Sequence, residues 1–192
     1  MLRALLLAPP GAGKGTQGER LADIYEVPHL STGELLRAEI ADRSPLGLEV
    51  EQYLDSGELV PDELLAPLLL QRAEGPEPLS GFVLDGFPRT PAQAHLAHEW
   101  GVETGLTFNA VISLEVPAEE LIERLVRRGG ETSRSDDTIE TIRLRQQIYA
   151  ESTEPLLEYY RERGILIAVD GTGTVDQVTD RITSRLDELD LN

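Results

Sequence analysis

The fold of this chain is decided by one short stretch, Ala8-Pro9-Pro10-Gly11-Ala12-Gly13-Lys14-Gly15-Thr16. An apolar run at 2–8 predicts a buried strand before it, and a helical pattern at 14–25 follows. Glycines in such a loop let backbone N–H groups turn inward around a phosphate, and the helix N-terminus adds partial positive charge. The spacing departs from GxxxxGK[ST], since Ala8 stands at the first glycine, where a β-carbon disfavours a positive φ. The strand-loop-helix context favours a phosphate loop over a plain glycine-rich turn.

The charge distribution draws attention to the same loop. The chain has 17 lysine and arginine residues against 35 aspartate and glutamate residues, a formal net charge of -18. A field of that sign repels nucleic acid, so we expect no nucleic-acid partner and a local cationic cluster for any phosphate ligand. The single lysine, Lys14, lies inside the loop. Its ammonium can reach the β and γ phosphate oxygens while the Thr16 hydroxyl faces Mg²⁺.

Apolar runs alternate with helical patterns along the chain. This alternation predicts βαβ units and an α/β three-layer fold, a five-stranded parallel sheet between helices, within one domain over 1–192. Two excursions, 31–60 and 129–135, interrupt the rhythm, and such loops commonly carry binding and closure. The expected strands are 2–8, 82–84, 110–116 and 165–169, with a weaker one at 28–30, and the expected helices are 14–25, 33–41, 62–73, 91–100, 118–128, 138–162 and 175–189.

Cysteine content and hydropathy indicate the cellular compartment to expect for the protein. Without cysteine there is neither a disulfide framework nor a thiolate zinc site, so we expect no zinc and a cytoplasmic location. The N-terminal apolar run is shorter than a signal-peptide core. No stretch approaches the roughly 20 apolar residues that a membrane helix needs, so we expect no membrane partner.

Further motifs carry polar groups that suit a second ligand. Ser31 or Thr32 can cap the helix that follows, and Arg37 lies about one turn into it, where it can reach back to that end. By itself this pattern is equally a capped helix with a solvated arginine. The stretch 81–90 ends an apolar strand with Asp85 and Arg89, at the edge where open α/β sheets bind ligands.

Arginines gather in the last third of the chain. Arg124 and Arg128 share one helix face at i and i+4, although cations at a helix end are favourable without any ligand. Arg134 and Arg145 are the stronger candidates for binding phosphate. Guanidinium groups satisfy the equatorial oxygens of a transferring phosphoryl group bidentately, which an ammonium does not.

Taken together, these motifs resemble the adenylate kinases, a branch of the nucleoside monophosphate kinase family. The loop at 10–17 looks like the phosphate loop of that family, and 81–90 closely resembles its GFxLDGFPRT signature. The stretches 29–37, 57–62, 134–145 and 169–173 resemble its HxSTGDxLR, GxLVPDE, RxDDxxxTxxxR and VDG elements in family order. The short interval between Arg128 and Asp136 resembles the short-lid form.

The resemblance implies a Mg²⁺-dependent, reversible reaction, ATP + AMP = 2 ADP, by in-line transfer without a phospho-enzyme. It also implies an AMP-binding insertion at 31–60, a short lid at 129–135, and ATP, AMP and ADP as the partners of a monomer. The catalytic residues expected are Lys14, Arg89, Arg128, Arg134 and Arg145; the ATP-binding residues are Gly11, Ala12, Gly13, Lys14, Gly15, Thr16, Arg124, Arg128 and Gly173; the AMP-binding residues are Thr32, Gly33, Arg37, Glu58, Leu59, Val60, Gly86, Phe87, Pro88, Arg89, Gln93, Arg134 and Arg145; and the Mg²⁺ residues are Thr16 and, through water, Asp85.

Two alternatives stay open at this point. A UMP/CMP kinase of the same fold usually carries alanine where Thr32 stands and asparagine where Thr90 stands, so both positions favour AMP. A nucleotide sensor without turnover predicts missing arginines at Arg89, Arg134 or Arg145, and all three are present. The sequence leaves open whether dAMP is accepted and why the chain is so acidic.

Overall fold

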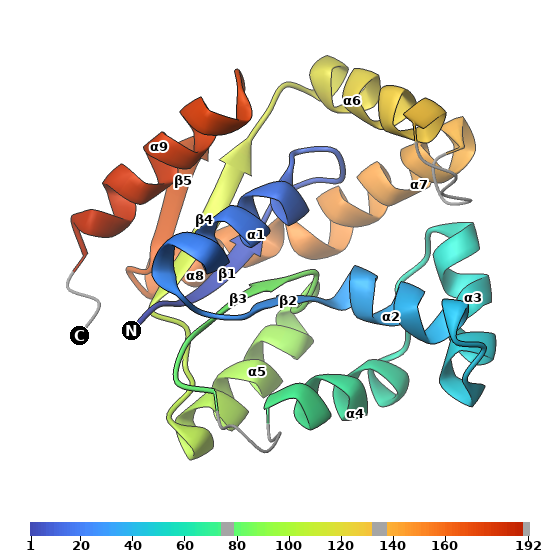
Figure 1. Cartoon of the computed structure of the whole chain (residues 1–192), viewed down its shortest axis with the longest axis horizontal. Coiled ribbons are helices and arrows are strands. Elements are labelled where there is room, and N and C mark those ends of the chain that lie inside the picture. Colours follow the sequence, from blue (N-terminus) through green and yellow to red (C-terminus); the bar gives the residue numbers. More distant parts are fainter. Residues whose placement is uncertain (74–78, 132–137, 190–192) are drawn as a thin grey trace.

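A parallel sheet forms the centre of the molecule. The computed structural model describes residues 1–73, 79–131 and 138–189, and its strands run in the order β2-β3-β1-β4-β5 (Figure 1). The predicted α/β fold with a five-stranded parallel sheet is therefore confirmed, including the weak strand near 28–30. The strands are β1 Arg3–Leu7, β2 His29–Ser31, β3 Phe82–Asp85, β4 Ala110–Glu115 and β5 Leu166–Asp170.

The register of the strands brings polar groups to one edge of the sheet. Ser31, the last residue of β2, pairs with Asp85, the last residue of β3, and Asp85 in turn pairs with Leu6 of β1. Because the strands are parallel, their carboxyl ends meet at the same edge. The loop that leaves β1 after Leu7 therefore starts beside Asp85, with Ser31 one strand further along the same edge.

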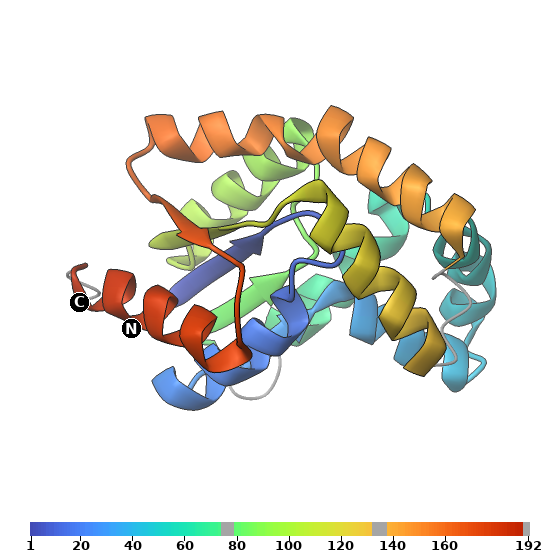
Figure 2. The same ribbon diagram turned by 90° about the horizontal axis from the view of Figure 1, so that it is seen from above.

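Helices cover both faces of the sheet. Seen from above, α1 and α9 lie on one side of it, and α5 and α8 lie on the other (Figure 2). The described ranges contain no helix that is both long enough and apolar enough to cross a membrane. The helices are α1 Lys14–Tyr25, α2 Thr32–Ala41, α3 Pro45–Ser56, α4 Asp62–Ala73, α5 Pro91–Thr104, α6 Ala118–Glu131, α7 Ile139–Ile148, the π-helical turn η1 Tyr149–Thr153, α8 Pro155–Glu162 and α9 Val175–Asp187.

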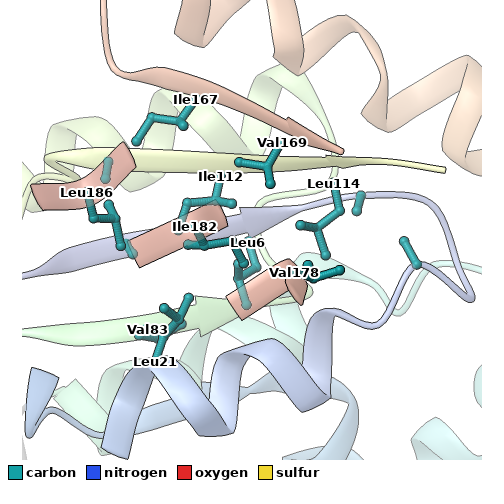
Figure 3. Packing of buried hydrophobic residues seen from close by; sticks show 14 of the residues in the cluster. Leu6, Leu21, Val83, Ile112, Leu114, Ile167, Val169, Val178, Ile182 and Leu186 are labelled. Carbon is teal, nitrogen blue, oxygen red and sulfur yellow. The ribbon is translucent and has the colours of Figure 1, made fainter. Parts of the chain in front are cut away.

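The main core holds α1 and α9 on the sheet. Leu21 of α1 and Ile182 of α9 pack with Leu6 of β1 and Ile112 of β4 (Figure 3). Leu21, Ile112 and Ile182 have no exposed surface, and burying a side chain of this size stabilises the fold by about 1.5–3 kcal/mol. This packing fixes α1, and with it the glycine loop that α1 follows.

A smaller core lies away from the sheet. Helices α2, α3 and α4 pack around the buried side chains of Leu36, Val50 and Leu65. Gly47 lets α3 approach α2 closely, because a β-carbon there would lie 2.0 Å from the carbonyl oxygen of Glu39. The excursion that interrupts the βα rhythm in the sequence is therefore helical and has its own apolar cluster.

The expected single helix at 138–162 is wrong, because it is broken near its middle. The N–H of Glu154 donates to the carbonyl of Tyr149 at 2.8 Å, an i to i−5 bond that makes η1 a π-helical turn. Pro155 has no N–H to continue an α-helical ladder, so the chain inserts this turn and restarts as α8. The break leaves the Thr153 hydroxyl free to donate to the carbonyl of Arg89 at 2.9 Å.

Two other helices are longer than expected. Helix α5 continues to Thr104 and ends at Gly105, whose left-handed φ of 76° suits a glycine cap. Helix α6 continues to Glu131, so residues 129–131 are helical and not part of a loop. The rest of the expected lid, 132–135, lies outside the described residues. Leu121 and Leu125 of α6 are buried, and this packing outweighs the low helix propensity of the two glycines.

Candidate active site

A wide cleft opens at the carboxyl edge of the sheet. Its volume is about 1000 Å³, and its walls come from the β1–α1 loop, the chain after β3, α6, α7 and the β5–α9 turn. A smaller cavity of about 70 Å³ adjoins it and is bounded by α2, the chain between α3 and α4, and α5. Gly33, Arg37, Leu59, Arg89 and Arg145 line both spaces. The two cavities are thus neighbours that share a row of cations.

The loop after β1 has the shape that its glycines predict. Gly11 and Gly13 adopt left-handed φ values of 90° and 93°, which cost glycine little. A β-carbon at Gly11 would also lie 2.8 Å from the carbonyl oxygen of Leu121 in α6. Among the non-glycine residues of the described ranges, only Glu26 and Arg43 have a positive φ. The alanine at position 8 therefore requires no left-handed backbone and leaves the loop unstrained.

Lys14 lies among other cations. Its ammonium donates to the carbonyl of Ala8 at 2.6 Å and to that of Pro9 at 3.2 Å. Burial lowers the pKa of Lys14 to about 8, the nearby Asp85 carboxylate opposes this shift, and Arg89, Arg145 and Arg128 add to it. The lysine of the loop and these three predicted arginines all line the same cleft.

Arg89 is fixed by the chain around it. Its Nε donates to the carbonyl of Gly86 at 2.8 Å. Burial lowers its pKa, Asp85 raises it, and Arg145 and Arg37 lower it further. Gly86 has a φ of 88°, and a β-carbon there would lie 2.2 Å from the hydroxyl of Thr32. The turn after β3 can therefore direct the Arg89 guanidinium toward the cavities only because residue 86 is glycine.

Asp85 is the main acid in this cationic surrounding, and it is 8% exposed. The Ser31 hydroxyl donates to its Oδ2 at 3.5 Å, and Nε2 of His29 lies 3.9 Å from the same oxygen. A β-carbon at Gly18 of α1 would lie 2.3 Å from His29 Nε2, so glycine is needed there for the imidazole to fit. Sequence reasoning gave His29 no role, since this contact joins separate elements.

The turn after β5 lines the cleft with Gly171 and Gly173. Arg124 of α6 donates to Glu120 at 2.5 Å and to the carbonyl of Gly171 at 3.0 Å. The Asp170 carboxylate accepts from the N–H and the hydroxyl of Thr172 at 2.9 and 2.7 Å. Gly173 follows with a φ of 97°. These contacts hold the backbone of the turn at the wall of the cleft.

The small cavity carries the other group of predicted residues. Thr32 is buried at 1% exposure. A β-carbon at Gly33 would lie 3.2 Å from Nη2 of Arg37, so this guanidinium does reach back to the start of α2, as its sequence position indicates. Gln93 is 4% exposed; its Oε1 accepts from the backbone N–H of Arg89 at 2.6 Å and its Nε2 donates to Asp62.

The structure gathers most of the predicted residues. Phe87 is an exception: it lines neither of the two cavities that the described residues form and packs instead against the small apolar core. Arg134 lies outside the described residues. The larger cleft is lined by Gly11, Ala12, Gly13, Lys14, Gly15, Thr16, Gly33, Arg37, Leu59, Asp85, Gly86, Pro88, Arg89, Arg124, Arg128, Arg145 and Gly173, and the smaller cavity by Thr32, Gly33, Arg37, Glu58, Leu59, Val60, Gly86, Arg89, Gln93 and Arg145.

Supporting contacts were missed at the sequence level. Gln146 of α7 donates to the carbonyl of Pro10 at 2.8 Å across 136 residues of chain. Thr153 supports Arg89, and Asp62 supports Gln93. In the sequence, Asp62 stands out only as part of the motif at 57–62, and Gln146 and Thr153 carry no local signal. None of the three contacts joins residues that are close in sequence.

Comparison with known proteins is consistent with this geometry. Residues 6–165 match the family model described as Adenylate kinase. The adenylate kinase of Xanthomonas euvesicatoria pv. vesicatoria (strain 85-10) is 44% identical over 96% of this chain and 99% of its own length. That of Trichodesmium erythraeum (strain IMS101) is 43% identical over 98% of this chain and 100% of its own. That of Clavibacter michiganensis subsp. michiganensis (strain NCPPB 382) is 46% identical over 97% of this chain and 93% of its own length.

Proposed function

The chain belongs to the adenylate kinase family, a family of phosphotransferases, and on that premise we propose that it transfers the terminal phosphoryl group of magnesium-bound ATP to AMP, reversibly, to form two molecules of ADP. One observation carries the proposal. Lys14, Arg89, Arg128 and Arg145 meet around one cleft in a chain whose net charge is -18. A cation cluster in so acidic a protein indicates a site built for several phosphates.

We assign ATP to the glycine loop and the walls next to it. The left-handed glycines turn N–H groups of the loop inward, and the N-terminus of α1 adds partial positive charge. Arg128 and Lys14 face the phosphates in this assignment. The adenine ring lies between Arg124 and the turn at Gly173, where Arg124 is already braced by Glu120.

We assign AMP to the small cavity. Arg37 and Arg89 bind its phosphate, and Arg145, which lines both cavities, lies between the two nucleotides. The base meets Gln93, a buried residue that lines the cavity. The hydroxyl of Thr32, which donates to the carbonyl of Asp85 at 3.3 Å, fixes the wall beside the phosphate. The backbone of neighbouring residues completes the site: Gly33, Glu58, Leu59, Val60, Gly86 and Pro88. Phe87 supports it from the apolar core and does not line it.

The residues present fit Mg²⁺ when it arrives with ATP. The described residues include no group of three or more histidine, aspartate or glutamate side chains that could hold a metal ion alone. Mg²⁺ prefers few carboxylates together with phosphate oxygens and water. The Thr16 hydroxyl and, through water, the Asp85 carboxylate supply such a partial shell. When bound, Mg²⁺ neutralises charge on the phosphate oxygens.

The proposed transfer needs no base and no covalent protein intermediate. An oxygen of the AMP phosphate, already anionic, attacks the terminal phosphorus of ATP, and the bond from that phosphorus to the bridging oxygen breaks as ADP leaves. Lys14, Arg89, Arg128 and Arg145 align the two nucleotides and stabilise the charge on the moving phosphoryl group. We propose the same role for Arg134, which lies outside the described residues.

We further propose that two segments close over the substrates. The segment 31–60 is the AMP-binding insertion and 129–135 is the short lid. Closure excludes water, which would otherwise accept the phosphoryl group. The contact of Gly57 with Thr141 and Arg145 supports the closure of the first segment, since it joins that segment to α7, the helix that carries Arg145.

The test is a coupled assay of ADP formed from ATP with AMP, CMP or UMP as the acceptor. We expect AMP to be preferred, and Lys14→Ala to lower kcat about 100-fold or more, as expected for losing one charge-stabilising contact. Preferred transfer to CMP would instead identify a UMP/CMP kinase of the same fold. Nucleotide binding without transfer to any of the three would identify a sensor.

A further inference from the structure

We infer that Asp62 is a positioning residue that determines base specificity, because it holds the amide of Gln93 in the one orientation that pairs with an amino-substituted base and opposes an oxo-substituted one. The inference rests on the proposed function, in which Gln93 faces the base of the acceptor nucleotide. Asp62 is the first residue of α4 and is half-buried. In the described range 1–73 it does not line either cavity, so it acts through Gln93.

The amide of Gln93 is held at both ends. Its Nε2 donates to Oδ1 of Asp62, and its Oε1 accepts from the backbone N–H of Arg89 at 2.6 Å. The side chain is 4% exposed, so water cannot readily replace either partner. The start of α5 is fixed as well, because the Gln93 N–H donates to the Thr90 hydroxyl at 3.2 Å.

Both partners permit only one orientation of the amide. The two ends of a glutamine amide have nearly the same shape, so packing alone does not choose between them. A backbone N–H can only donate, and a carboxylate can only accept. Turning the Gln93 amide by half a rotation would set its NH₂ against the Arg89 N–H and its oxygen against Asp62. Two buried hydrogen bonds would become two repulsive contacts.

The orientation that remains has a definite hydrogen-bonding pattern. Gln93 still has one N–H on Nε2 and one lone pair on Oε1, side by side. Adenine offers a ring nitrogen that accepts and an amino group that donates, which is the complement of this pair. A 6-oxopurine such as hypoxanthine offers a ring N–H and a carbonyl oxygen, the reverse pattern on an almost identical outline. Shape cannot separate these two bases, but the polarity of the Gln93 amide can.

The same reasoning extends to pyrimidines. Cytosine presents the adenine pattern, and uracil presents the hypoxanthine pattern. Asp62 therefore separates amino-bases from oxo-bases, whereas the preference for purines over pyrimidines must come from the size of the cavity. Loss of the Asp62 contact should therefore shift the preference between AMP and IMP and the preference between CMP and UMP in the same direction.

The decisive variant is Asp62→Asn, whose side chain can either accept from or donate to the Gln93 amide. We expect the ratio of kcat/KM for AMP over IMP to fall about tenfold, the worth of one hydrogen bond of roughly 1.4 kcal/mol. The ratio for CMP over UMP should fall in the same direction. The change should appear mainly as a higher KM for AMP, with kcat at saturating AMP within about twofold of the wild type.

Glu63→Gln is the matched control. Glu63 is the next residue of α4, is exposed, and is the other acid of the first helical turn. Removing its charge changes the helix terminus as Asp62→Asn does, but it touches no contact of Gln93. We expect both nucleotide ratios to remain at the wild-type value. A second variant, Asp62→Ser, keeps a small polar residue at the helix start if Asp62→Asn does not fold.

Several results would overturn the inference. One is a wild-type protein that accepts IMP as well as AMP, which needs no variant to observe. Another is an Asp62→Asn protein with unchanged ratios, or one that loses turnover with all nucleotides equally and melts at a lower temperature, as a purely structural residue would. If the wild type transfers phosphate to no monophosphate, the proposed function fails by itself. Calorimetric affinities for AMP and IMP would then still test the role of Asp62.

Discussion

The two nucleotide regions of the molecule are built in different ways. In the donor region, the glycine loop, the Lys14 ammonium donates to a carbonyl only six residues away. In the acceptor region, supporting contacts join Asp62 to Gln93 over 31 residues, Ser31 to Asp85 over 54, and Thr153 to Arg89 over 64. The glycine loop of the donor region therefore takes its shape from local backbone geometry and is braced from outside by Gln146, whereas the acceptor region depends throughout on correct packing of several helices.

This difference predicts where substitutions act. A change in the donor region should disturb one nucleotide and leave the rest of the site intact. A change in the acceptor region should spread through its supporting contacts. Arg145 belongs to both, since it lines both cavities.

Arg145→Ala should have the largest effect, because it removes a cation shared by the two regions. We expect kcat to fall about 100-fold or more, with a smaller change in either KM, as for an interaction made chiefly in the transition state. Steady-state kinetics with ATP and AMP measure this. Arg143→Ala is the control, since Arg143 lies on the same helix α7 but is exposed. Equal effects of the two substitutions would remove Arg145 from the proposed mechanism.

Gly57→Ala should disturb the acceptor region more selectively. The new β-carbon would lie 2.7 Å from Cγ2 of Thr141, at a φ of 80°, so α3 must move away from α7. We expect KM for AMP to rise severalfold while KM for ATP changes little.

Gly105→Ala provides the matched control for this experiment. Gly105 has a similar φ of 76°, but a β-carbon there meets nothing within 4 Å. Both substitutions cost about 1–2 kcal/mol of stability through backbone strain, so any difference in KM reports the contact with α7. If both variants have the same KM for AMP, that contact does not contribute to AMP binding.

Gln146→Leu should have the smallest effect, and it acts on the donor region. It removes the hydrogen bond to the carbonyl of Pro10, worth about 1 kcal/mol. We expect KM for ATP to rise about fivefold, with KM for AMP unchanged. Gln147→Leu removes only a surface contact with Glu151 and should have no effect. A rise in KM for AMP instead would mean that the two regions are less separate than the structure indicates.

Prediction from sequence succeeded where the necessary groups are consecutive. The glycine loop, the strand before it and α1 after it follow from a stretch of about 25 residues. Four strands of the sheet were also predictable, because each is a short apolar run bounded by turn residues. The fifth, β2, was only weakly indicated, because its sequence is His-Leu-Ser. Prediction failed at η1, where an apparently continuous helical pattern is interrupted ahead of Pro155.

Among the predicted site residues, positions were easier to predict than contacts. Arg37 does reach back to the start of α2, because one helical turn determines that distance. The same local logic could not reveal that Asp62 bonds Gln93 or that Gln146 bonds the glycine loop. Those contacts depend on how α4, α5 and α7 pack, and helix periodicity says nothing about which helices become neighbours.

Local sequence patterns establish the chemistry available to this protein: a phosphate loop with its lysine, a set of arginines, and a parallel sheet to carry them. These follow from local rules, since φ preferences and apolar periodicity act within a few residues. The packing of distant elements brings Lys14, Arg89, Arg128 and Arg145 to one cleft. It also selects the partners that hold the Gln93 amide. Those outcomes depend on the burial of side chains contributed by distant elements, and burial is a property of the packed molecule as a whole.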